Sequence, residues 1–135
     1  MNNLIRLCVF LCCVSSPFLL YAEDEVVSSD GDHYVSIHPP FSVNFADDSE
    51  AVYMQIGVEV LTSDRETEDA IKEHMPAVKQ ALIYLFSTQS YSELRTRKGK
   101  KELSKKAADT IQKTLKSLKS EDNVQAVLFT SFMMQ

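Results

Sequence analysis

Val52-Tyr-Met-Gln-Ile-Gly-Val-Glu-Val60 decides the fold of this chain. Apolar residues stand at every second position, and this period of two predicts a β-strand with one buried face. Before it, residues 34–45 alternate in the same way but are interrupted by Pro39 and Pro40. Because proline has no N–H to give to a β-ladder, the interruption predicts a bulge or an edge position. We therefore expect two neighbouring strands here.

Helical patterns follow the central strand. Ser63-Asp-Arg-Glu66 has the form of a capping box, in which the serine opens a helix. Apolar residues from Ile71 to Phe86 then recur at helical spacing, and Pro76 suits the first turn of a continuing or new helix. This segment is expected to pack one apolar stripe against a sheet.

A long helix and a last strand complete the domain. Ser90 starts a second possible capping box, and Thr96 is expected to cap a helix over residues 97–118. Residues 124–134 are rich in Val, Phe, Leu and Met and predict a strand. The apolar stripe of the long helix is Leu103, Ala107, Ile111, Leu115 and Leu118.

The order of these elements predicts the fold class. Two strands, then helices, then a third strand favour an α+β domain: a small antiparallel or mixed sheet of about three strands, with helices packed on one face. The 135 residues are enough for one such domain.

The N-terminal segment is typical of an export signal. Arg6 precedes an uncharged apolar run, and acidic residues begin directly after Ala22. This pattern predicts a signal peptide over residues 1–22 that is cleaved near Ala22, or a membrane anchor over residues 4–22. A lipidated cysteine is a third reading. In the anchored case, Arg6 predicts that the N-terminus stays inside and the domain lies outside the cytoplasm.

The remainder divides into an acidic linker, residues 23–33, and a domain, residues 34–135. The domain carries no cysteine, and therefore no disulfide, thiol nucleophile or thiolate metal site. No histidine pair has metal-ligand spacing, and no glycine-rich phosphate loop or nucleophile elbow is present. We therefore expect no enzyme, cofactor, metal or small-molecule substrate. The three cysteines, all in the apolar run, are Cys8, Cys12 and Cys13.

Charge is distributed unevenly along the chain. Residues 95–119 hold ten basic and two acidic residues, a net +8, whereas the remainder holds four basic and seventeen acidic residues, a net −13. The overall charge of −5 gives no reason to expect a nucleic-acid partner. A basic helix face can attract anionic lipid or an acidic partner surface, or simply keep the helix soluble. The candidate contact residues, where basic density is highest, are Arg95, Arg97, Lys98, Lys100, Lys101 and Lys105.

Six segments carry a resemblance to a known family. They are Tyr34-Val-Ser-Ile-His-Pro-Pro-Phe-Ser-Val-Asn44, Tyr53-Met-Gln-Ile-Gly-Val-Glu-Val60, His74-Met-Pro-Ala-Val-Lys79, residues 82–90, Leu94-Arg-Thr-Arg-Lys-Gly99 and Val127-Leu-Phe-Thr-Ser-Phe-Met-Met-Gln135. In this order and spacing, residues 34–135 resemble FliL, the family of flagellar basal-body-associated proteins.

The resemblance implies both a fold and a function. The fold would be related to the stomatin/prohibitin-type domain and would lie in the periplasm beside the inner membrane. The function would be that of a non-enzymatic accessory protein that forms a ring-like homo-oligomer, binds the flagellar stator and supports motility, including chemotaxis or swarming. The alternative is a soluble periplasmic FliL-like envelope adaptor with no direct flagellar role, which binds anionic lipid or an acidic partner through its basic helix. Family members usually keep a clear membrane anchor, whereas the apolar run here is short.

Overall fold

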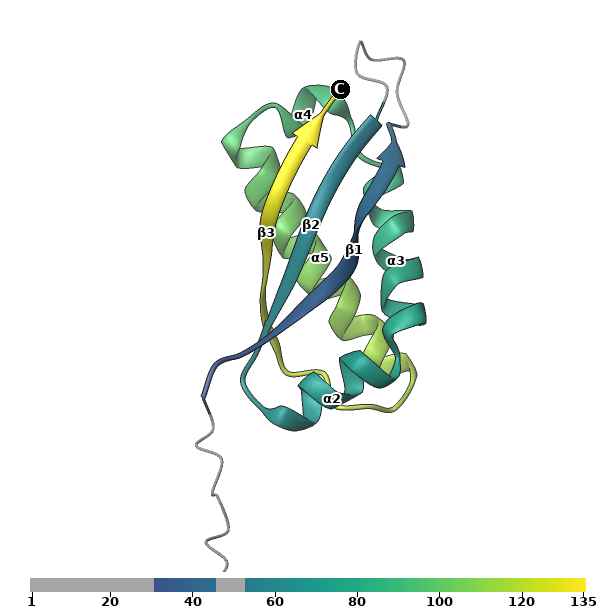
Figure 1. The fold of residues 1–135 in the computed structure, drawn as a ribbon, viewed down its shortest axis with the longest axis vertical. Coiled ribbons are helices and arrows are strands. Elements are labelled where there is room, and N and C mark those ends of the chain that lie inside the picture. The colour runs from purple at the N-terminus through teal and green to yellow at the C-terminus, as the bar shows by residue number, and fades with distance from the viewer. Residues whose placement is uncertain (1–30, 46–52) are drawn as a thin grey trace, which may run out of the picture.

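The computed structural model describes residues 31–45 and 53–135. Three strands form one antiparallel sheet in the order β1-β2-β3, and Figure 1 shows the helices packed on one face of it. The predicted α+β architecture is thereby confirmed. The strands are β1 (His33–Asn44), β2 (Tyr53–Thr62) and β3 (Val124–Met134). The helices of the described residues are α2 (Arg65–Glu73), α3 (Met75–Ser87), α4 (Tyr91–Leu94) and α5 (Arg97–Ser117).

The core lies between β2 and the helices, as the alternation along β2 predicts. Met54, Ile56 and Val60 are fully buried beneath α3 and α5. The stripe on α5 is also buried as far as Leu115. Leu118, which we expected to continue the stripe, is 42% exposed, because the helix ends before it and the residue caps the last turn.

The diproline makes β1 an irregular edge strand, as expected. The register between β1 and β2 shifts between Ile37 and Phe41, where Pro39 and Pro40 leave the ladder. The His38–Pro39 peptide bond is cis. The side chain of Lys79 on α3 donates a hydrogen bond to the backbone carbonyl oxygen of His38, 2.8 Å away.

Two of the three expected helix caps differ from the prediction. Asp64, not Ser63, caps α2: its carboxylate accepts a hydrogen bond from the backbone N–H of Thr67 at 2.6 Å. Ser90 occupies the cap position of α4, but its side chain makes no capping bond. Thr96 caps α5 as predicted, and its hydroxyl accepts from the N–H of Gly99 at 2.9 Å.

Several predictions fall on residues outside the described part of the chain. They are the signal peptide or anchor over residues 1–22 and most of the acidic linker, which therefore stay predictions. β1 begins at His33, inside the segment expected to be linker. Among residues 31–45 and 53–135, no helix combines the length and apolar character needed to cross a membrane. The likeness to a stomatin/prohibitin-type domain also stays a prediction.

Candidate functional site

The junction between α4 and α5 is a tightly built turn. The hydroxyl of Thr96 donates to the carbonyl oxygen of Glu93 at 2.8 Å, while it accepts from the N–H of Gly99. Leu94 and Leu103 on either side are both 1% exposed and anchor the turn in the core. We call this junction, with its cations Arg95, Arg97, Lys98, Lys100 and Lys101, the basic elbow. The sixth predicted contact residue, Lys105, lies one turn further along α5.

Three of the six predicted contact residues already have partners within the domain. The guanidinium of Arg95 lies over the ring of Tyr91, 5.7 Å from its centroid. The ammonium of Lys100 lies 4.7 Å from the centroid of the Phe132 ring on β3. The ammonium of Lys105 is 3.8 Å from the Glu102 carboxylate. These contacts hold the cations against the domain, so they contribute to its packing as well as to its charge.

The other three cations point into solvent. Arg97, Lys98 and Lys101 are exposed, and each makes no ion pair, hydrogen bond or ring contact within residues 31–45 and 53–135. They also lie at the positive end of the α5 dipole, where no acidic residue occupies the first turn. Local helix stability therefore does not explain their concentration at this end of α5.

The acidic residues of α2 lie at the opposite end of the domain (Figure 1). Residues 64–73 hold five acidic and two basic residues. Burial opposes the ionisation of Asp64, but hydrogen bonds from Thr67, Asn123 and Ser63 outweigh it and lower the pKa of Asp64. A hydrogen bond from Lys72 lowers the pKa of Glu68, against the effect of burial.

His33 fastens the start of β1 to α2. Its Nδ1 lies 2.9 Å from the Glu68 carboxylate, and both side chains are 20% exposed. Asn123, in the loop before β3, donates to the Asp64 carboxylate at 2.7 Å. The entry to β1, α2 and the α5–β3 loop therefore form one end of the domain.

The basic elbow lies at the other end. Figure 1 shows α4, the start of α5 and the C-terminus together at one end of the long axis, and the start of β1 and α2 at the opposite end. A helix of the 21 residues of α5 is about 30 Å long. The basic elbow and the acidic residues of α2 are thus separated along the molecule, while Lys113 and Lys116 lie in the last turns of α5, toward the end that holds α2 (Figure 1).

Two grooves flank α5, and the sequence analysis identified neither. One, of about 420 Å³, lies between α4 and α5, and its charged lining residues are Lys98, Lys106, Glu93 and Glu102. Its lining is therefore electrically balanced.

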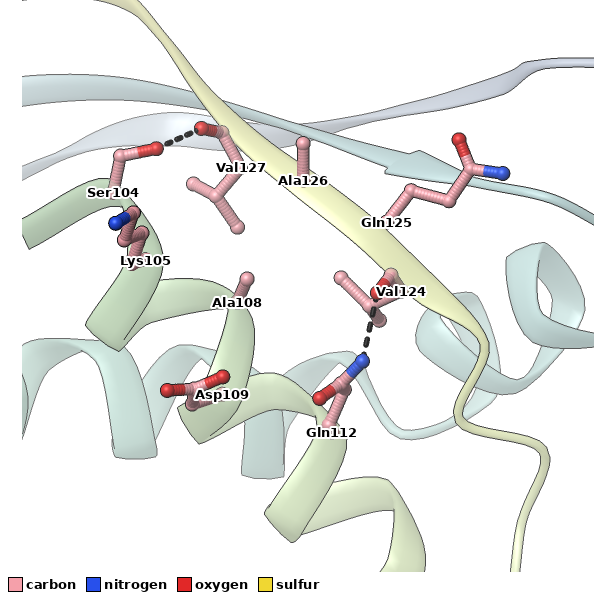
Figure 2. Close-up of a pocket in the computed structure, with 9 residues that line it drawn as sticks. All are labelled: Ser104, Lys105, Ala108, Asp109, Gln112, Val124, Gln125, Ala126 and Val127. Atoms are coloured by element: carbon pink, nitrogen blue, oxygen red, sulfur yellow. Dashed lines mark hydrogen bonds between the residues drawn. The ribbon is translucent and has the colours of Figure 1, made fainter. Parts of the chain in front are cut away.

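The other groove, of about 280 Å³, lies between α5 and β3 (Figure 2). Here Ser104 donates to the carbonyl oxygen of Val127, and the amide of Gln112 donates to that of Val124 at 2.7 Å. Side chains of α5 thus satisfy backbone carbonyl oxygens of the edge strand β3. A serine or glutamine on a basic helix gives no sequence signal of that role.

The described residues bring no metal-binding set together. Within them, no group of three His, Cys, Asp or Glu side chains is arranged to hold a metal ion. His33 and His74 are instead paired with Glu68 and Ser120. What the surface offers is charge and strand edge, which are means of binding another polypeptide.

Comparison with known proteins identifies the family of the chain. The sequence profile described as "Flagellar basal body-associated protein FliL" matches residues 34–135. The flagellar protein FliL of Aquifex aeolicus is 28% identical over 99 residues, which are 73% of this chain and 59% of that protein. The flagellar protein FliL of Escherichia coli K12 is 27% identical over 130 residues, 91% of this chain and 83% of that protein. The chain belongs to the FliL family of flagellar basal body-associated proteins.

Proposed function

We propose that this chain is a non-enzymatic accessory protein of the flagellar basal body, which supports stator function and motility by binding itself and the stator at the periplasmic side of the inner membrane. Family membership over residues 34–135 supports the flagellar role. The observation that carries the binding role is the set of three solvent-facing cations at the basic elbow. Positive charge at the positive end of the α5 dipole is unfavourable within the domain, and an acidic partner surface best explains why three cations stand there.

A protein partner for the basic elbow is supported by the acidic residues of α2, which a second copy would present at the opposite end of the domain (Figure 1). If residues 4–22 stay in the membrane, the chain enters the domain at His33, at the end opposite to the elbow. Repeated head-to-tail contact between the acidic residues of α2 in one copy and the elbow of the next would be a heterologous interface that can close into a ring.

A charge reversal in the full chain tests the proposal. The variant Arg97→Glu, Lys98→Glu, Lys101→Glu replaces the gene, and a fluorescent fusion reports recruitment to the flagellar base. We expect fewer basal foci and a smaller swarm diameter. The matched control is Lys106→Glu, Lys113→Glu, Lys116→Glu, which makes the same charge change further along α5, outside both the elbow and the α5–β3 loop, and should leave both readouts near wild type.

Three results would contradict the proposal or part of it. Swimming and swarming that survive deletion of the gene would favour the envelope adaptor instead. Equal loss in both charge-reversal variants would show that net charge, and not the elbow, governs recruitment. The protein can also be sedimented with the cell envelope in the presence of competing vesicles. If only vesicles of anionic lipid reduce the amount that sediments, the elbow binds lipid.

A further inference from the structure

The sheet has two edges, and the β1 edge is interrupted in its middle. Outward backbone groups of an edge strand pair readily with another chain unless they are blocked. Pro39 and Pro40 in the middle of β1 have no N–H to offer. The carbonyl oxygen of His38 already accepts a hydrogen bond from Lys79. This edge is therefore a poor template for an added strand.

The first half of the β3 edge is closed by α5, as Figure 2 shows. The carbonyl oxygen of Val124 accepts from Gln112, and that of Val127 accepts from Ser104. Since both acceptors are directed at α5, they are directed away from β2. The closure ends at Val127.

The second half of the β3 edge is open. Tyr53 and Gln135 exchange backbone hydrogen bonds of 2.7 and 2.9 Å, so Gln135 faces β2. By the alternation of an antiparallel ladder, Phe132 and Met134 direct their N–H and C=O groups outward. No other hydrogen bond within residues 31–45 and 53–135 reaches these groups. The sequence from 127 to 135 has no charged residue and no proline to protect it.

Basic side chains of α5 border this open edge. Ser104 marks the flank of α5 that faces β3. Lys101 and Arg97 stand three and seven residues before it and therefore share that flank. Because Lys100 lies on Phe132, the first turns of α5 run beside the last residues of β3. The edge thus suits an extended segment that carries negative charge.

The chain itself contains such a segment. Residues 23–32 include five carboxylates, at Glu23, Asp24, Glu25, Asp30 and Asp32, around the β-branched pair Val26-Val27. We propose that residues 23–32 of a second copy add to β3 as an antiparallel strand along residues 131–135. With Ser28 opposite Met133, residues 26–30 pair with residues 135–131, and the three acidic residues at positions 23–25 continue past the end of β3 toward the basic elbow. This inference rests on the self-association proposed above and names the segment that makes the contact.

The pairing register of the strands favours residues 23–32 of a second copy over the same residues of the same chain. His33 and Val124 both pair with Thr62, so the segment leaves β1 level with the far end of β3 from Met134. Ten extended residues span at most about 35 Å. In its own chain, residues 23–32 would need most of that length to pass from the start of β1 across the sheet and along β3 to residues 131–135. From a second copy, all of it is available for pairing.

Disulfide trapping in the full chain tests the added strand. In a background with Cys8, Cys12 and Cys13 changed to serine, Ser28→Cys is placed on one purified chain and Met133→Cys on another that carries a tag of different size. Neighbouring strands bring side chains within disulfide reach. We expect a covalent heterodimer on mild oxidation of the mixture. The control replaces Met133→Cys by Ser42→Cys, an exposed position on the β1 edge that Pro39 and Pro40 interrupt, and should give little product.

A charge exchange separates a specific contact from random collision. Arg97→Glu with Lys101→Glu on the Met133→Cys chain should lower the yield about threefold or more, because opposite charges at an interface then become like charges. Glu23→Lys, Asp24→Lys and Glu25→Lys on the Ser28→Cys chain should restore it. A merely structural effect of the two α5 substitutions would not be rescued in this way.

Each outcome decides the inference. Equal yields of cross-linked dimer from Met133→Cys and Ser42→Cys overturn it. A cross-link that forms only within a single chain carrying both Ser28→Cys and Met133→Cys also overturns it. If the heterodimer fails while sedimentation shows oligomers, the strand addition is wrong and the proposed self-association stands. If the full chain also sediments as a monomer at high concentration, the self-association itself is wrong.

Discussion

The α-carbon of Gly99 packs against the backbone carbonyl group of Glu93, so that a side-chain methyl group at position 99 would overlap the carbonyl oxygen. The contact is between backbone atoms, which cannot rotate away. It sets how closely α5 can follow α4, and hence the direction in which the basic elbow presents its cations.

Gly99→Ala should therefore destabilise the domain. In an open helix the change would stabilise by about 1 kcal/mol, since alanine is the better helix former. Here the overlap with Glu93 should dominate and cost roughly 1–3 kcal/mol. Urea unfolding measures the difference, and Lys101→Ala, on the exposed side of the same helix, should change the free energy of unfolding by less than about 0.5 kcal/mol. A more stable Gly99→Ala chain would contradict the packing described here.

Asp64→Ala should cost about 1–2 kcal/mol of stability, because it removes the α2 cap. Its carboxylate also accepts from Asn123, which ties the α5–β3 loop to α2. Asp64→Asn keeps a capping oxygen and should lose less. Ser63→Ala is the control, since Ser63 does not cap the helix. Equal losses in Ser63→Ala and Asp64→Ala would restore the capping box that the sequence suggested.

The stability contributed by Glu68 should depend on pH. Its pKa is lowered in the folded domain, chiefly by the hydrogen bond from Lys72 and also by His33. A lowered carboxylate pKa adds stability above the unfolded value, about 4.3, that is lost as pH falls through the folded value. Wild type and Glu68→Gln should thus differ most in unfolding free energy at neutral pH and converge in acid. A difference that grows toward low pH would reverse the assigned sign.

Ser104→Ala combined with Gln112→Ala should open the first half of the β3 edge. Each lost hydrogen bond should cost about 0.5–1.5 kcal/mol, and the freed carbonyl groups of Val124 and Val127 should favour association through the edge. Light scattering against concentration, with thermal unfolding, measures both effects. Thr110→Ala is the control, because its hydroxyl bonds only within α5, to Lys106. Unchanged scattering would mean that the side chains of α5 do not prevent association through the β3 edge.

Much of the fold could be predicted because it follows from local periodicity. The alternation in β2 identified the buried face, and the spacing from Leu103 to Leu115 identified the buried stripe of α5. Thr96 was predictable as a cap because its bond reaches only three residues ahead. The Ser63 cap was wrong because Asp64 gains a partner 59 residues away, Asn123, which no local pattern reveals.

The sequence by itself determined the three strands, the long helix and the list of cations, since these depend on period, composition and neighbouring residues. Only the tertiary structure decided which cations are available. Arg95 and Lys100 are drawn onto the rings of Tyr91 and Phe132, whereas Arg97 remains in solvent. It also decided that the elbow and His33 lie at opposite ends, and that one stretch of strand edge is left open. Those properties arise from contacts between segments distant along the chain, which sequence order alone does not specify.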